Sequence, residues 1–190
     1  MLTQILQFLI DTLSGFFVYL LLARFHFQWL RVPFRNQLGQ FLMSITNWLV
    51  MPARRVVPSA GGFDLATLLL ALLLQALTLW LLFTLGGAQF GANPGAAVAT
   101  LGALAGLDLL RYSIHILIFA LIVQAVLSWT NPGSPMMGWF DTVVRPFLRP
   151  IRRFLPPVAN FDLSPLALLV VLQVMLIALS YGRGMVAGAF

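Results

Sequence analysis

Four long apolar stretches restrict what this sequence can fold into. They cover residues 5–23, 65–85, 113–129 and 163–181, and each has the length of about 17 to 25 residues with which a helix crosses a bilayer. In hydrocarbon every backbone polar group must be paired within the protein, and a helix does this within one segment. The sequence therefore predicts an all-α membrane protein with four transmembrane helices.

The composition excludes several other classes of protein. Hydrophobic residues make up 61% of the chain and charged residues only 8%, whereas soluble domains carry about 25% charged residues. A soluble enzyme is therefore excluded, and so is a disulfide-stapled secreted domain, because the chain has no cysteine. The first stretch contains Asp11 and has no basic segment before it, so we expect it to remain as a span instead of being removed as a signal peptide.

The charges are unevenly distributed along the chain. All 11 basic residues are Arg and all 5 acidic residues are Asp. Most of the Arg residues lie in the connections after the first and third stretches, at positions 24, 31, 35, 54, 55, 145, 149, 152 and 153. Because short Arg-rich connections stay in the cytoplasm, both termini are predicted to lie on the other side. The net charge of +6 on so apolar a chain predicts a membrane with anionic lipids as the partner, and no nucleic acid.

Two of the remaining segments have amphipathic periodicity. Apolar side chains recur every three or four positions in residues 36–51, with Asn36, Gln40, Ser44 and Asn47 on the opposite side, and residues 136–148 repeat the pattern. We expect an interfacial amphipathic helix in each segment. Residues 95–106 are rich in Ala and Gly and uncharged, which fits either a helix packed closely on the bundle or a re-entrant segment.

The two halves of the chain resemble each other. A shift of 98 positions matches 11 of the 24 residues from 52 to 75 without a gap, and the matches include two Pro, the Arg pair, Phe-Asp and Gln. The sequence predicts a first repeat at 1–85, an Ala/Gly-rich connection at 86–106 and a second repeat at 107–190. Because each repeat has two spans, both copies have the same orientation, and their symmetry axis lies along the membrane normal.

The repeated motif carries a family resemblance. The two runs are PARRVVPSAGGFDLA and RPIRRFLPPVANFDLSP, and each resembles one module of the tandem YggT family, also called YlmG, of bacterial and plastid membrane proteins. The resemblance implies an inner-membrane protein linked to osmotic-stress tolerance, to division and membrane organisation, and in plastids to assembly of membrane complexes. The chain departs from the family pattern at Thr67, where the second copy has Pro165, and at Gln124, which aligns with Arg24.

No catalytic, metal or cofactor site is predicted. The chain has only two His and no Glu or Cys, so it lacks the His-Glu-x-x-His zinc motif and any thiolate ligand. It also lacks the Gly-x-Ser-x-Gly nucleophile turn and a phosphate-binding loop ending in Lys.

The repeated Arg pairs are the first candidate binding residues. Arg54, Arg55, Arg152 and Arg153 either hold their loops in the cytoplasm, or bind anionic headgroups at about 1 kcal/mol each, or bind an acidic segment of a partner. The repeated motif then continues with Asp64 and Asp162 directly before apolar runs. These Asp residues either cap the next helix or pair with the Arg residues.

A second group of polar residues lies within the spans. Gln75 and Gln173 fall near mid-span at matching positions, and we expect them to approach each other or make equivalent interhelical hydrogen bonds, or to line a polar pathway. Asp108, Arg111 and His115 are spaced to share one face of the third span. Asp11 is an unmatched intramembrane acid, for which we expect Arg111 or His115 as partner, or an ion or proton site.

These features lead to two functional hypotheses. The first is a non-catalytic assembly or organising factor that acts through its Arg-rich cytoplasmic face, with a membrane-protein partner or as a homo-oligomer. The alternative is a small oligomeric channel or transporter for ions or osmolytes, lined by Gln75, Gln173 and Asp11.

Overall fold

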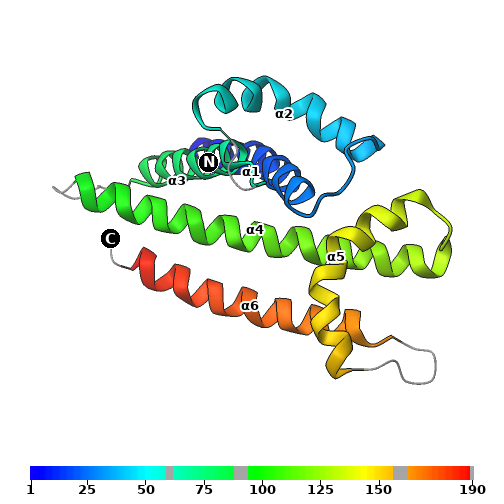
Figure 1. Cartoon of the computed structure of the whole chain (residues 1–190). Coiled ribbons are helices and arrows are strands. Elements are labelled where there is room, and N and C mark those ends of the chain that lie inside the picture. The colour runs from blue at the N-terminus through cyan, green and yellow to red at the C-terminus, as the bar shows by residue number, and fades with distance from the viewer. Residues whose placement is uncertain (59–61, 88–93, 156–161, 189–190) are drawn as a thin grey trace.

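The computed structural model describes residues 1–58, 62–87, 94–155 and 162–188. These residues form helices joined by short connections, with no strand among them. The helices are α1 (Leu2–Trp29), α2 (Gln37–Val56), α3 (Leu65–Leu85), α4 (Pro94–Thr130), α5 (Pro135–Phe154) and α6 (Ser164–Ala187). Figure 1 shows α4 and α6 side by side, α5 crossing both of them, and α2 lying over α1 and α3.

The prediction of four spans is confirmed. Within the described residues α1, α3, α4 and α6 are long and apolar enough to cross a membrane, and the chain is an all-helical multi-pass membrane protein. The structure also decides between the two interpretations of residues 95–106. They form the first turns of the 37-residue α4, so the helix of the third span begins at Pro94, within the predicted connection, and a re-entrant segment at 95–106 was wrong. The small side chains allow close helix packing, and Leu104 and Ala105 are buried against Leu79 of α3.

The two amphipathic segments form helices of 20 residues each, α2 and α5. Asn36 caps α2 by accepting a hydrogen bond from the backbone N–H of Gly39, and Ser134 caps α5 by accepting one from Met136. The buried residues recur at helical spacing, as the sequence pattern requires: they are Gly39, Leu42, Thr46 and Val50 in α2, and Phe140, Val143, Val144 and Leu148 in α5. Each helix therefore packs one face on the bundle.

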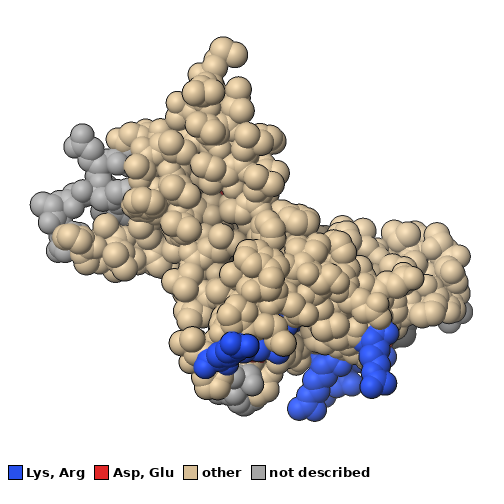
Figure 2. Space-filling view, turned by 90° about the horizontal axis from the view of Figure 1, so that it is seen from above, with Lys and Arg blue, Asp and Glu red and all other residues tan. Residues whose placement is uncertain are grey.

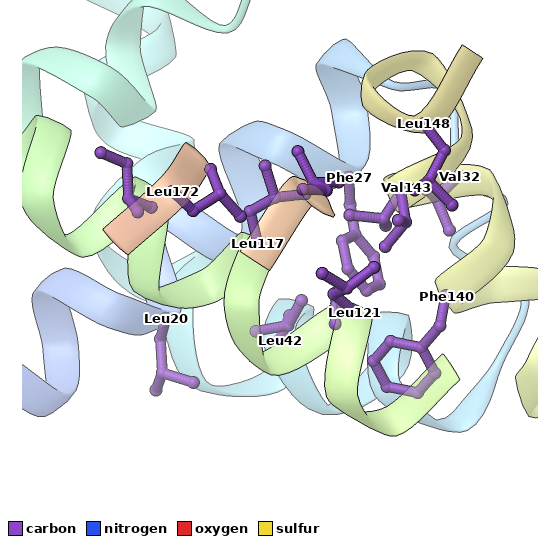
Figure 3. Close-up of a cluster of buried hydrophobic side chains, with 14 residues drawn as sticks. Leu20, Phe27, Val32, Leu42, Leu117, Leu121, Phe140, Val143, Leu148 and Leu172 are labelled. Atoms are coloured by element: carbon purple, nitrogen blue, oxygen red, sulfur yellow. The ribbon is translucent and has the colours of Figure 1, made fainter. Parts of the chain in front are cut away.

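The hydrophobic core joins both predicted repeats. Figure 3 shows Leu117 and Leu121 of α4 beside Val143 of α5, with Phe27 of α1 in the same cluster. A second cluster joins residues of α1, α2 and α3 to Leu109 of α4. Because both clusters draw on the two halves of the chain, the halves share buried surface and stabilise each other.

The start of α2 depends on a close backbone approach at Gly39. A Cβ atom there would lie 2.7 Å from the carbonyl oxygen of Phe34, so Gly39→Ala should force the backbone apart and cost about 1–3 kcal/mol. Thermal unfolding in detergent micelles measures this cost. The matched control is Gly138→Ala in α5, where the added Cβ meets no atom within 4 Å and should raise stability by up to about 1 kcal/mol. Equal melting temperatures for the two variants would contradict this account.

Candidate functional site

The first repeat contains a buried ion pair between α2 and the start of α3. Arg54 Nη2 lies 2.6 Å from Asp64 Oδ2, and the Asp64 side chain is fully buried. Asp64 also accepts hydrogen bonds from the hydroxyl and the backbone N–H of Thr67, so the same carboxylate caps α3. Both interpretations of Asp64 therefore hold. Thr67, where the family pattern has Pro, supplies a hydroxyl donor that proline lacks.

The second repeat contains the matching contact in a more open setting. Arg152 Nη2 lies 2.8 Å from Asp162 Oδ2, and the Asp162 side chain is 37% exposed. Asp162 accepts a hydrogen bond from the backbone N–H of Ser164 at 3.0 Å, at the start of α6. The residues of the two ion pairs are related by the same shift of 98 positions that the sequence contains.

Hydrogen bonding determines the ionisation of both carboxyl groups. Burial alone would raise the pKa of Asp64, but hydrogen bonds from Arg54 and Thr67 and the charge of Arg54 hold it below its ordinary value. Burial would likewise raise the pKa of Asp162, and the hydrogen bonds from Ser164 and the charge of Arg152 lower it. Both Asp residues are therefore charged at neutral pH, and each neutralises one Arg.

The two residues of each Arg pair have different surroundings. Arg54 and Arg152 are engaged by Asp, whereas Arg55 and Arg153 are exposed and have no ion pair among the described residues. The same is true of Arg31, Arg35 and Arg149. Figure 2 shows the visible Arg side chains gathered along one edge of the molecule, with the rest of that face uncharged. The five exposed Arg residues named above, which we call the Arg-rich edge, therefore keep uncompensated positive charge.

An apolar groove opens beside the turns of α5 that contain Arg149. It has a volume of about 950 Å³ and is lined by side chains of α1, α3, α4, α5 and α6. Pro146, Phe147, Pro150 and Ile151 of α5 form one wall, in the same turns as Arg149, which is exposed. A groove of this volume is in the range of small-molecule sites, and its apolar lining suits a hydrocarbon chain.

Three polar residues of the spans, Gln75, Asp108 and Arg183, form a cluster around the Asp108 carboxylate. Its Oδ2 accepts a hydrogen bond from Gln75 Nε2 at 3.0 Å, and its Oδ1 accepts one from Arg183 Nε at 2.8 Å. Asp108 is 4% exposed and Gln75 is 3% exposed. This carboxylate thus joins α3 of the first repeat to α4 and α6 of the second, and Arg183 supplies the neutralising charge that a buried acid needs.

The other intramembrane candidates do not join this cluster. Gln173 is exposed on α6, so the prediction that it would meet Gln75 or repeat its contacts was wrong for the described chain. Asp11 is exposed on α1, and its carboxylate has neither Arg111 nor His115 as a hydrogen-bonding or ion-pair partner. His115 Nδ1 lies 3.4 Å from the Tyr19 hydroxyl. Gln75, Gln173 and Asp11 therefore do not line one path within a single chain.

A further polar contact at the end of α1 escaped the sequence analysis. Arg24 is 4% exposed and donates hydrogen bonds to Thr46 Oγ1 at 2.7 Å and Asn47 Oδ1 at 2.8 Å. At the matching place in the second repeat, Gln124 donates to Asp141 Oδ1 at 3.4 Å. The alignment of Arg24 with Gln124 was the available signal. It indicated the position, but not that α2 or α5 supplies the partner.

Comparison with known proteins identifies the family of this chain. The family model described as CCB3/YggT matches residues 3–85 and 103–182, and the chain belongs to this family. It is 34% identical over 171 residues to the protein YggT of Escherichia coli K12, covering 89% of this chain and 86% of that protein. A Vibrio alginolyticus protein from the proC 3' region is 34% identical over 172 residues, covering 88% of this chain and 89% of the relative. No solved structure matches the chain.

The different burial of the two Asp residues leads to a prediction about stability. Asp64→Asn removes the charge that pairs with Arg54 in a fully buried site and should cost about 2–3 kcal/mol. Asp162→Asn removes the matching charge in a partly exposed site and should cost less than about 1 kcal/mol. Thermal unfolding of the two variants in the same detergent measures the difference. Equal losses would show that the ion pairs do not differ in strength.

The direction of the pKa shift predicts how this difference varies with pH. Because the pKa of Asp64 is lowered in the folded chain, its stabilisation is fully present above the ordinary carboxyl pKa of about 3.9 and is lost as the pH falls through the lower folded-state value. The advantage of the natural chain over Asp64→Asn should therefore stay constant near neutral pH and shrink below about pH 4.

Proposed function

We propose that this chain is a non-catalytic organising factor of a bacterial inner membrane, and that its Arg-rich edge binds anionic lipid headgroups. The observation that carries the proposal is the division of each Arg pair. Arg54 and Arg152 are each neutralised by an Asp of the chain, while Arg55 and Arg153 are exposed without an ion pair among the described residues. An uncompensated Arg beside a membrane attracts anionic lipid with about 1 kcal/mol.

The groove beside the edge supports lipid as the ligand. Its wall includes Pro146 and Pro150, which flank the exposed Arg149 in sequence. A lipid has one charged end and one apolar end, so a headgroup at Arg149 leaves its acyl chain next to the groove. Each methylene buried there would contribute about 0.8 kcal/mol relative to water, but little relative to hydrocarbon. The specificity for anionic lipid therefore comes from the Arg side chains.

The same proposal includes two parallel repeats with α2 and α5 at the cytoplasmic interface. In its favour, α2 and α5 have equal length and begin 98 positions apart, as do the ion-paired residues Arg54 and Arg152. Both connections that contain these helices then face the cytoplasm, and both termini face away from it. In cells, such a lipid-binding edge would serve osmotic-stress tolerance and the organisation of the membrane or of division.

Cysteine labelling tests this orientation, because the chain has no native cysteine. Asn131→Cys lies in the turn between α4 and α5, and Gly188→Cys lies just after α6. In intact spheroplasts an impermeant thiol reagent should label Gly188→Cys and leave Asn131→Cys unlabelled until the membrane is opened. The reverse pattern would contradict the proposed orientation.

Replacing the exposed Arg residues tests the lipid proposal. The triple variant Arg55→Gln, Arg149→Gln and Arg153→Gln should bind phosphatidylglycerol at least about tenfold more weakly, because each Arg contributes about 1 kcal/mol. The measurement is the thermal stabilisation of the purified protein as this lipid is added to neutral detergent micelles. Stability in neutral micelles should not change.

The matched control is Arg111→Gln, an exposed Arg on α4 that lies outside the Arg-rich edge. It should respond to the lipid like the natural chain. The Arg-rich edge does not carry the function if the correctly inserted triple variant keeps the full thermal stabilisation by phosphatidylglycerol. The same conclusion follows if this variant still restores growth under osmotic stress in cells lacking the protein.

A further inference from the structure

The outer face of α6 has no partner, although the matching face of α3 is covered. α3 packs on α1, α2 and α4, whereas α6 packs chiefly on α4 and α5 within the described chain. Two matched pairs of residues show the difference. Gln75 is 3% exposed while its counterpart Gln173 is exposed, and Leu79 is 4% exposed while its counterpart Ile177 is 56% exposed.

The repeat shows which surface belongs on such a face. On α3 the matching face is covered by α4, through Leu101, Leu104, Ala105 and Asp108. A shift of 100 relates α4 to α1. This alignment superposes the buried Leu121 on the buried Leu21, and Gln124 on Arg24. It also carries the four covering residues onto the first half of α1, at Met1, Gln4, Ile5 and Phe8.

These four residues of α1 form an open surface. They line a shallow groove of about 250 Å³, and Ile5 and Phe8 are 53% and 68% exposed. Each repeat therefore has the surface that its counterpart uses, but this face of α6 and this face of α1 have nothing to pack on among the described residues.

Two unpaired polar groups lie on these surfaces. Gln173 is on the face of α6 that matches Gln75, and Asp11 is one turn, about 4.5 Å, from Phe8 on the same face of α1. Neither side chain has a hydrogen-bond partner among the described residues. An amide or carboxyl group left unpaired in hydrocarbon costs several kcal/mol. Within the chain, the amide nitrogen of Gln75 is paired by donating to Asp108 at 3.0 Å.

We propose that a second copy of this chain covers α6, with its own α1 packed on α6 as α4 packs on α3. Gln173 of one copy then donates to Asp11 of the other. α6 and α1 run in opposite directions through the membrane, as α3 and α4 do, so both copies have the same orientation. Two copies satisfy both surfaces at once when α6 of each packs on α1 of the other. The inference rests on the proposed function only for this common orientation.

The register of α3 on α4 gives the position for a cross-link. Leu79 packs with Leu104, and their counterparts are Ile177 and Gln4. Ile177→Cys in one tagged copy and Gln4→Cys in a differently tagged copy, expressed together, should form a disulfide that joins the two tags on mild oxidation in membranes.

The matched control replaces Ile177→Cys by Ala178→Cys. Ala178 is also exposed and at the same depth, but it lines the apolar groove on another side of α6. The inference is overturned if inserted Gln4→Cys and Ile177→Cys copies give no joined product, or if the Ala178→Cys pair reacts as fast. Either result would mean that a different protein, or lipid alone, covers α6.

The polar pair provides a second readout. Gln173→Leu and Asp11→Leu should each weaken self-association in liposomes by about three- to tenfold, measured by energy transfer between labelled copies. Val174→Leu, the neighbouring exposed position on α6, should have no effect. The double variant should be no weaker than either single variant, because the two groups act as one interaction. Additive losses would contradict a direct contact between Gln173 and Asp11.

The test is independent of lipid binding by the Arg-rich edge. The triple variant at Arg55, Arg149 and Arg153 leaves the α6–α1 surfaces unchanged, so it should cross-link like the natural chain. A variant that loses lipid binding but keeps the cross-link separates the two proposals, as does one that keeps lipid binding and loses the cross-link.

Discussion

The pairing of charges at and within the membrane is the constraint on which this structure depends. Each junction between an amphipathic helix and the following span is closed by an Arg–Asp ion pair, Arg54 with Asp64 and Arg152 with Asp162. Deeper in the bundle, Asp108 is satisfied by Gln75 and Arg183. An unpaired charge at the buried Asp64 or Asp108 would cost several kcal/mol, so the helices pack in the arrangement that pairs these carboxylates. Exposed Arg residues that have no ion pair among the described residues, such as Arg55 and Arg153, remain available to a ligand.

Much of the fold is predictable because hydrocarbon permits few solutions. The four spans follow from apolar length, and the two amphipathic helices follow from apolar spacing in the segments between them. The capping and pairing roles of Asp64 were both foreseen as alternatives, because an Asp before an apolar run and a nearby Arg are local signals. In the structure one carboxylate performs both roles.

Long-range packing was not predictable from the same sequence. Asp108 and Arg183 are 75 positions apart in the sequence. This separation is far larger than the spacing of neighbours on one helix, and no sequence pattern relates the two residues. The symmetry of Gln75 and Gln173 was misleading for a physical reason. Identical positions in a repeat have identical surroundings only if each repeat has the same neighbours. The first repeat has the second beside it, while the matching face of α6 has no such neighbour among the residues that the structure describes. The departure from symmetry indicates where a further contact is needed.

The central claim is that neighbouring Arg residues in one motif have different roles, one structural and one for binding. The most direct measurement compares the thermal unfolding of Arg54→Gln and Arg55→Gln in nanodiscs of neutral lipid. The account predicts a clear loss of stability for Arg54→Gln, which leaves the buried Asp64 carboxylate unpaired, and an unfolding temperature close to that of the natural chain for Arg55→Gln. Equal losses, or a larger loss for Arg55→Gln, would contradict it.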